Sequence, residues 1–282
     1  MYAVYVSSSV TPRVLRGLCF LLAATFLPIQ SFAQQSAYLG FDRNDYPGDE
    51  NLKVLWQTFS YAGYWLNNPP GAASNSWAGK RALLESAGFG FLVLFNGRLD
   101  AQLQHNATAL GRSDGNAATS AAKREGFSAH TIIFLDLEEG GRMLPEQKAY
   151  IYAWVDAVNA SGFRAGVYCS GIPVREDKNT VINTADDIRA NAHGRDITYW
   201  VTQDSCPPSP GCVFLKQPAS PAGSKISYAD VWQFVQSPKR PEFAAKCSGY
   251  NQADGNCYPP GVDPASHLHI DVNTATSADP SH

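Results

Sequence analysis

Short hydrophobic runs alternate with longer stretches of mixed polarity along most of the chain. Runs of this length, with many branched or aromatic side chains, are typical of buried strands. The pattern predicts eight strands, over Tyr38–Asp42, Ala62–Leu66, Phe89–Phe95, Thr131–Glu138, Arg164–Ser170, Ile197–Gln203, Val231–Gln236 and Leu268–Asn273.

Several of the intervening stretches have helical spacing. The clearest is Pro145–Ser161, in which apolar residues recur at helical intervals. Pro145 suits a first helical turn, and Gly162 marks the stop. The other predicted helices are Trp77–Ala87, Asp114–Glu125 with Asp114 as its cap, and the shorter Thr184–Ala192.

Strands that alternate with helices imply parallel βαβ units, and eight of them predict an α/β fold of the (β/α)8 TIM-barrel type. An open doubly wound sheet is the alternative, but no glycine-rich phosphate loop follows the first strand. Proline-rich, cysteine-bearing loops replace regular helices after the sixth and seventh strands. No linker-like stretch divides the barrel, which indicates a single domain.

The first 33 residues have the layout of a secretory signal peptide. Arg13 and Arg16 precede an apolar run over Leu18–Leu27, and the small residues Ser31 and Ala33 follow it. A membrane anchor is the alternative, but a spanning helix needs about 20 apolar residues. We therefore expect cleavage after Ala33, which leaves residues 34–282 as an exported barrel without a transmembrane anchor.

Composition narrows the class of protein. The chain is 44% hydrophobic and 17% charged, which supports a sizeable core and excludes a disordered chain. The signal peptide contains two of the 22 basic residues and none of the 25 acidic ones, so the exported part has a net charge of −5. This balance gives no electrostatic footprint for nucleic acid.

Five cysteines remain in the exported part. Export permits disulfides, and the simplest pairing closes two short loops, Cys206 with Cys212 and Cys247 with Cys257. Cys169 lies inside an apolar run, which favours a buried thiol over a nucleophile. No cysteine or histidine spacing indicates zinc, and we expect neither a metal nor another cofactor.

The candidate chemistry emerges from the alternation of side chains along the predicted strands. In the fourth strand, Asp136 and Glu138 share the face opposite an apolar face, so both carboxylates point to the barrel axis. The residues of the apolar face are Ile133, Leu135 and Leu137. Asp42 in the first strand and Asp271 in the last follow the same pattern. Because barrel active sites lie at the carboxyl ends of the strands, we expect four carboxylates at one rim.

Carboxylates gathered in one cavity suit few kinds of chemistry. Like charges at short range raise at least one pKa, which provides the acid and the base that glycoside hydrolysis requires. A hard cation such as calcium or magnesium is a second use for these oxygens. A third possibility is structural, with the acids capping helices or pairing with arginines. The Asp-x-Glu spacing together with acids on two other strands favours a functional site.

Aromatic and amide side chains lie near the same predicted rim and suit sugar binding through ring stacking and hydroxyl recognition. Barrel packing with satisfied polar groups is the alternative for each of them, with Trp200 and Trp232 balanced between the two. These candidates are Trp65, Asn67, Asn96, Tyr168, Trp200 and Trp232. Glu139 should face outward or into the loop, and His269 fits a satisfied core histidine.

Several motifs resemble the family 25 glycoside hydrolases, lysozymes of the Chalaropsis type that cleave the glycan chain of peptidoglycan. They are GFDRNDYPG at 40–48, the Asp-Leu-Glu at 136–138, Trp-Gln-Phe at 232–234 and Ile-Asp-Val-Asn at 270–273. Three further segments are similar to the glycoside hydrolase-like barrels of domain of unknown function 1906. These are GYWLNNPPG at 63–71, WAGKRALL at 77–84 and GVYCSGIPV at 166–174. One departure from the lysozyme pattern places Arg43 beside Asp42.

The resemblance implies a role for each acid. Glu138 would be the general acid, and Asp136 would orient or stabilise the 2-acetamido group of the substrate or act as a direct nucleophile. Asp42 and Asp271 would position water or the sugar, and Gln233 of the Trp-Gln-Phe motif would bind the substrate.

We therefore expect a monomeric glycoside hydrolase, secreted or periplasmic, that acts on a polysaccharide such as peptidoglycan. A non-catalytic glycan-binding barrel of the cell envelope is the alternative, and a metal-dependent hydrolase is a weaker third.

Overall fold

The computed structural model describes residues 37–204, 219–235, 250–251, 256–259 and 261–282. All of them belong to one unit, Gln35–His282. The predicted signal peptide lies outside the described residues and stays a prediction. Among the residues that are described, no helix combines the length and the apolar character that crossing a membrane requires.

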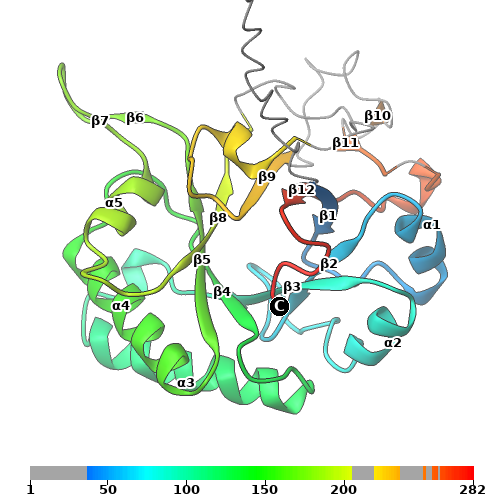
Figure 1. The fold of residues 1–282 in the computed structure, drawn as a ribbon, viewed down its shortest axis with the longest axis horizontal. Helices are drawn as coiled ribbons and strands as arrows, with labels where there is room; N and C mark the ends of the chain where they lie inside the picture. The colour runs from blue at the N-terminus through cyan, green and yellow to red at the C-terminus, as the bar shows by residue number, and fades with distance from the viewer. Residues whose placement is uncertain (1–36, 205–218, 236–249, 252–255, 260) are drawn as a thin grey trace, which may run out of the picture. The chain divides into compact units, whose positions relative to one another are not determined.

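Eight strands close into a barrel in the order β1-β12-β9-β8-β5-β4-β3-β2 (Figure 1). Their bounds are β1 Tyr38–Asp42, β2 Tyr61–Trp65, β3 Gly90–Asn96, β4 Ile132–Asp136, β5 Arg164–Ser170, β8 Thr198–Thr202, β9 Val231–Val235 and β12 Asp271–Ala275. All eight predicted strands are confirmed, although the last begins three residues later than predicted, at Asp271. The chain therefore forms a closed α/β barrel.

The direction of the last strand differs from the prediction. Seven strands run parallel, whereas β12 pairs antiparallel with both β1 and β9. A parallel strand needs a crossover that returns the chain to the opposite end of the barrel. An antiparallel β12 instead starts at the rim where β9 ends, so the prediction of eight parallel strands is wrong for this strand.

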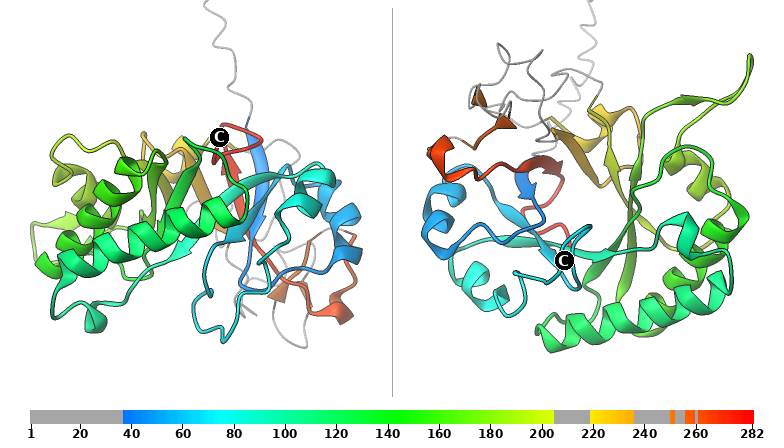
Figure 2. Two further views of the ribbon diagram at one scale, coloured as in Figure 1. Left: turned by 90° about the horizontal axis from the view of Figure 1, so that it is seen from below. Right: turned by 180° about the vertical axis from the view of Figure 1, so that it is seen from behind.

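Helices cover the outside of the barrel. They are α1 Leu52–Trp56, α2 Arg81–Ser86, α3 Ala107–Arg124, α4 Pro145–Ala160 and α5 Thr184–Ala190, with single turns η1 Asp49–Asn51, η2 Asp100–Gln102, η3 Pro221–Ser224 and η5 Pro264–Ser266. Helices α3 and α4 lie side by side along one flank (Figure 2). Pro145 begins α4 as predicted, and the sequence pattern did not predict α1.

The predicted start of α3 is wrong. The helix begins seven residues earlier, at Ala107, after Asn106 in a left-handed conformation with φ 64°. Asp114 lies inside the helix and does not cap it. It is buried and accepts hydrogen bonds from Arg98 at 2.6 and 2.9 Å, so its carboxylate joins α3 to the loop after β3.

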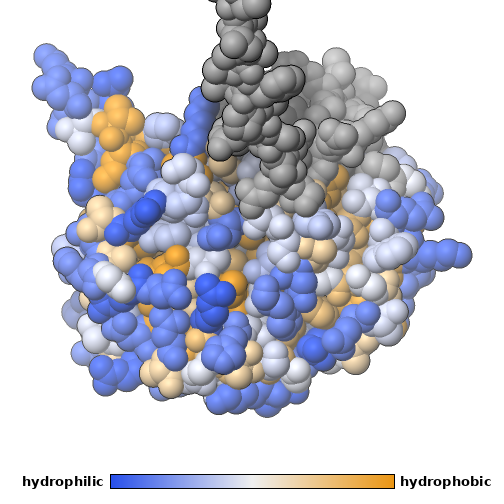
Figure 3. All heavy atoms as spheres, viewed as in Figure 1, coloured by the Kyte–Doolittle hydropathy of each residue, from blue (hydrophilic) through white to orange (hydrophobic). Residues whose placement is uncertain are grey.

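The described residues also form two small hairpins outside the barrel. The first pairs β6 Val174–Arg175 with β7 Val181–Ile182, and the second pairs β10 Tyr250–Asn251 with β11 Asn256–Cys257. The first projects from the barrel (Figure 1), and hydrophobic residues gather below its hydrophilic tip (Figure 3). Cys206, Cys212 and Cys247 lie outside the described residues, and only the backbone of Cys257 is described, so the disulfides stay predictions. Cys169 is a buried free thiol, as predicted.

The barrel interior below the rim is filled by aromatic rings. Phe134 of β4 meets Trp200 of β8 edge to face, with ring centroids 6.1 Å apart. A Cβ on Gly166 would lie 2.4 Å from the Phe134 ring, so the neighbouring strand needs glycine there. Side chains two residues apart on a strand share one face. The site residues Asp136 and Tyr168 therefore lie on the same inward face as Phe134 and Gly166, one pair closer to the rim.

Candidate functional site

A cavity of about 280 Å³ opens at the rim where the parallel strands end and β12 begins. The residues that line it are Asp42, Asn44, Trp65, Pro70, Leu94, Asp136, Glu138, Tyr168, Trp200, Gln233 and Asp271. A second cavity of about 350 Å³ shares Asp42, Asn44 and Asp271 with it. The structure thus brings all four predicted carboxylates to one cleft.

Strand register explains how these acids meet. Asp42 ends β1 and pairs with Asp271, the first residue of β12. Asp136 ends β4 and lies level with Tyr168 of β5. Gly63 on β2 leaves room for this cluster, because a Cβ there would lie 2.6 Å from the Cβ of Asp42.

Asp136 and Glu138 form the acidic centre. The Asp136 side chain is buried, and its Oδ2 has no hydrogen-bond partner among the described residues. Burial raises the pKa of Asp136 well above its ordinary value, and the charges of Glu138 and Asp42 raise it further. Partial desolvation also raises the pKa of Glu138, which is within hydrogen-bonding reach of Asp136. Two such carboxyls share a proton more readily than they both ionise.

Asp42 occupies a different environment on the facing strand. Its Oδ1 accepts hydrogen bonds from Gln233 Nε2 at 3.0 Å and from Asn273 Nδ2 at 2.7 Å. Burial raises the pKa of Asp42 to about 6, although both amide hydrogen bonds lower it. The site therefore combines a proton-holding pair with a carboxyl that hydrogen bonds favour in its charged form.

Aromatic side chains form much of the remaining lining. The rings of Tyr168 and Trp200 lie 4.4 Å apart at a tilt, and Trp65 donates its indole N–H to the backbone oxygen of Arg43 at 3.0 Å. Trp65, Tyr168 and Trp200 are all less than a tenth exposed. Their polar groups are already bonded to the protein, so they present mainly ring surface to the cavity.

Three predicted sugar-binding residues do not line this cavity. Asn67 and Asn96 clamp the ends of β2 and β3, since each side chain donates to or accepts from the neighbouring backbone. Trp232 is buried and donates its indole N–H to the backbone oxygen of Gln203 at 2.8 Å. His269 lines the second cavity, next to Asp271.

Sequence reasoning missed two polar residues of the site. Asn44 lines both cavities from the loop after β1, and no spacing in the sequence marks it. Asn273 lies beneath Asp42 and bonds to it. Its signal was present, since Asn273 ends the predicted last strand and alternates with Asp271 on the inward face, but only the carboxylate of that face was predicted as a site residue.

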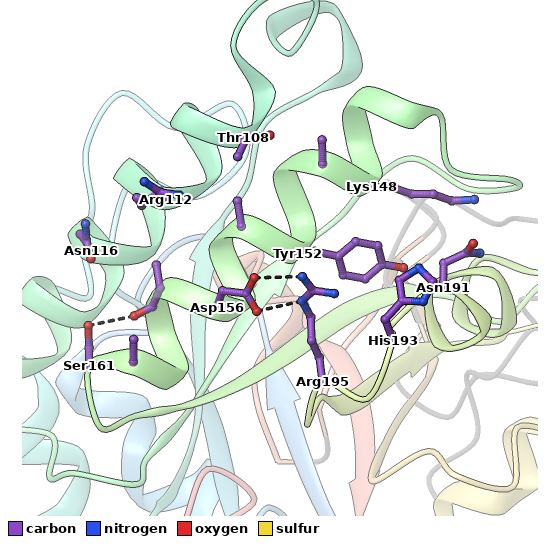
Figure 4. Close-up of a pocket in the computed structure, with 14 residues that line it drawn as sticks. Thr108, Arg112, Asn116, Lys148, Tyr152, Asp156, Ser161, Asn191, His193 and Arg195 are labelled. Carbon is purple, nitrogen blue, oxygen red and sulfur yellow. Dashed lines mark hydrogen bonds and ion pairs between the residues drawn. The ribbon is translucent and has the colours of Figure 1, made fainter.

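A larger depression of about 690 Å³ lies outside the barrel, along α3 and α4 (Figure 4). Of the described residues that line it, Asp156 is the one acidic side chain, and Arg195 pairs with it at 2.8 and 3.0 Å. The depression thus lacks the grouped acids of the rim. Within the described part of the chain, no cluster of three or more His, Cys, Asp or Glu side chains is arranged to hold a metal ion.

Comparison with known families and structures agrees with this fold. The model of the family described as "Rv2525c-like, glycoside hydrolase-like domain" matches residues 59–217. No curated protein matches the chain.

Three solved structures illustrate the likeness. An uncharacterized B. stearothermophilus protein is 18% identical, with 84% of this chain and 95% of that chain covered and a TM-score of 0.53. The Clostridium perfringens spore cortex lytic enzyme SleM is 9% identical, with 86% and 68% covered and a TM-score of 0.52. The Mycobacterium tuberculosis Tat-secreted protein Rv2525c is 14% identical, with 85% and 94% covered and a TM-score of 0.47. The first two likenesses show a shared fold.

Proposed function

We propose that this chain, which belongs to the Rv2525c-like, glycoside hydrolase-like domain family, is an exported hydrolase that cleaves a cell-wall glycan such as peptidoglycan. The supporting observation is the cavity at the barrel rim, lined by Asp42, Asp136, Glu138 and Asp271. We regard the barrel as a variant of the (β/α)8 TIM barrel with its last strand reversed. Active sites of such barrels lie at this rim.

The proposed mechanism divides the work between the acids. Glu138 is the general acid and delivers the proton to the glycosidic oxygen, because it lies at the mouth and its pKa is raised. Asp136 lies deeper, where it stabilises the 2-acetamido group as that group attacks the anomeric carbon, or attacks that carbon itself. Asp42 and Asp271 position the sugar or the water on the opposite wall.

The substrate class rests on two supports beyond the acids. Buried aromatic faces beside the carboxyls suit the flat apolar faces of sugar rings. The secretory pattern at residues 1–33 directs the protein to the cell envelope or the medium, where such glycans occur. SleM is named a spore cortex lytic enzyme, and its likeness supports the scaffold of this proposal.

The test is Glu138→Gln, with Glu139→Gln as the matched control. Glu139 accepts hydrogen bonds from the backbone N–H of Asp100 and from Gln147 and does not line the rim cavity. We expect Glu138→Gln to abolish the release of soluble fragments from purified peptidoglycan, measured by mass spectrometry, while the control keeps turning over substrate. Thermal unfolding of both variants checks that each folds.

Two outcomes would contradict the proposal. An unchanged release rate in Glu138→Gln would remove the general acid from the mechanism. Binding of the native protein to insoluble cell wall without any fragment release would indicate a glycan-binding barrel instead. In that case the mass spectra of native and variant digests would be identical.

A further inference from the structure

Two side-chain amides donate hydrogen bonds to Asp42, and each amide oxygen accepts a hydrogen bond from an aromatic residue. Trp200 donates its indole N–H to Asn273 Oδ1 at 2.9 Å, and Tyr168 donates its hydroxyl to Gln233 Oε1 at 2.8 Å. Each amide then donates its NH2 to the same oxygen of Asp42. All five side chains are less than a tenth exposed, so water does not easily replace any of these partners.

The indole determines the orientation of Asn273. An indole N–H only donates, so it must face the carbonyl oxygen of Asn273, and the NH2 group must then face Asp42. A tyrosine hydroxyl both donates and accepts, so Tyr168 imposes a weaker preference on Gln233. Trp200 and Asn273 are therefore the pair that makes Asp42 Oδ1 an obligatory acceptor.

We infer that Asn273, oriented by the indole of Trp200, is a positioning residue that keeps Asp42 ionised, so that the proton of the acidic centre stays on Asp136 and Glu138. Hydrogen bonds to the charged form of a carboxyl favour that form. A charged Asp42 in turn favours a proton on the Asp136–Glu138 pair across the cavity, since the like charges repel. The catalytic meaning of this arrangement rests on the proposed function, whereas the ionisation state of Asp42 does not.

Other charged and titratable groups surround Asp42 and also influence its ionisation, in addition to Trp200 and Asn273. They are Arg43 next to it in the chain, Tyr61 of β2, Asp136 and Glu138 at the end of β4, Tyr168 of β5, and Asp271 with His269 at the start of β12. Burial and the charge of Glu138 both oppose ionisation of Asp42. The donated hydrogen bonds from Asn273 and Gln233 act in the opposite direction.

The test is Trp200→Phe, which keeps a ring but removes the donor, compared with Trp232→Phe. Trp232 is also buried and also loses one indole hydrogen bond, but to the backbone oxygen of Gln203. The midpoint of Asp42 is measured by NMR titration of protein labelled with ¹³C at the aspartate carboxyls, with Asp42→Asn to assign the signal. We expect Trp200→Phe to raise the midpoint by about 1 pH unit, from about 6, and Trp232→Phe to leave it unchanged.

A midpoint that stays in place in Trp200→Phe, or that moves equally in both variants, would overturn the inference. If Trp200→Phe does not fold, Asn273→Leu decides the matter, because it removes the donor to Asp42 directly and must raise the same midpoint. The titration needs no substrate. A shifted midpoint in a protein that releases no glycan fragments would therefore sink the proposed function and leave this inference standing.

Discussion

Asp42→Asn should make the folded protein more stable above neutral pH. Burial raises the pKa of Asp42 from 3.8 to about 6 in the folded state. A carboxyl with a raised folded pKa contributes stability that is fully present below its unfolded pKa and is lost as the pH rises through its folded pKa. The stability that Asp42 contributes is therefore lost as the pH rises from about 4 to about 6.

The size of the effect follows from the same shift. A rise from 3.8 to about 6 corresponds to about 3 kcal/mol of stability that the charged carboxyl removes above this pH range. Asparagine has nearly the same shape, and its carbonyl oxygen still accepts from Gln233 and Asn273. We expect Asp42→Asn to raise the free energy of unfolding at pH 7.5 by about 1–3 kcal/mol, since its new NH2 group lacks an assured partner.

Urea denaturation at several pH values measures this difference. The gain should shrink as the pH falls and disappear only well below the unfolded pKa of 3.8, where the carboxyl is protonated in both the folded and the unfolded protein. Asp49→Asn is the control, because the hydrogen bond from Lys80 lowers the pKa of exposed Asp49 and gives the opposite sign. A variant at position 42 that is less stable than the native protein at every pH would refute the reasoning from desolvation.

Two further predictions concern packing and reactivity. Gly63→Ala should lower the free energy of unfolding by about 1–3 kcal/mol, because its Cβ would collide with the acidic cluster, whereas Gly140→Ala meets nothing closer than 3.6 Å and should be nearly neutral in thermal unfolding. The Cys169 thiol should resist iodoacetamide at pH 8 in the native protein, because burial raises its pKa, and should react in urea. Peptide mapping by mass spectrometry distinguishes the two states of Cys169.

Alternation along a strand was a reliable guide to the site, because it depends only on local geometry. The face of β4 that carries Asp136 was predicted from its neighbours, and the barrel places that side chain in the cavity. The same reasoning placed Tyr168 and Trp200 correctly. Each of these strands is short and buried, so a one-residue error in register would have turned the polar inward face toward the surrounding helices.

Features that depend on distant partners were not predictable in this way. Aspartate is a common helix-capping residue, but Asp114 lies inside α3, where its buried carboxylate accepts hydrogen bonds from Arg98 and Tyr150. Asparagine is a residue type that often binds sugars, but Asn67 and Asn96 hydrogen-bond to each other's segments at the ends of β2 and β3. A sequence pattern shows what a side chain is able to bind, whereas the fold determines which partner lies within reach.

The reversed β12 shows how strand direction, more than composition, completes the site. Asp271 lies at the rim, where it pairs with Asp42. In a parallel strand, Asn273 would lie about 7 Å further out than Asp271, beyond the rim. In the antiparallel strand it lies that far inward, level with Gly40 and Gln233, where its amide meets Asp42 from below. The direction of one strand thus converts a residue that would face solvent into a buried hydrogen-bond donor to the acidic cluster.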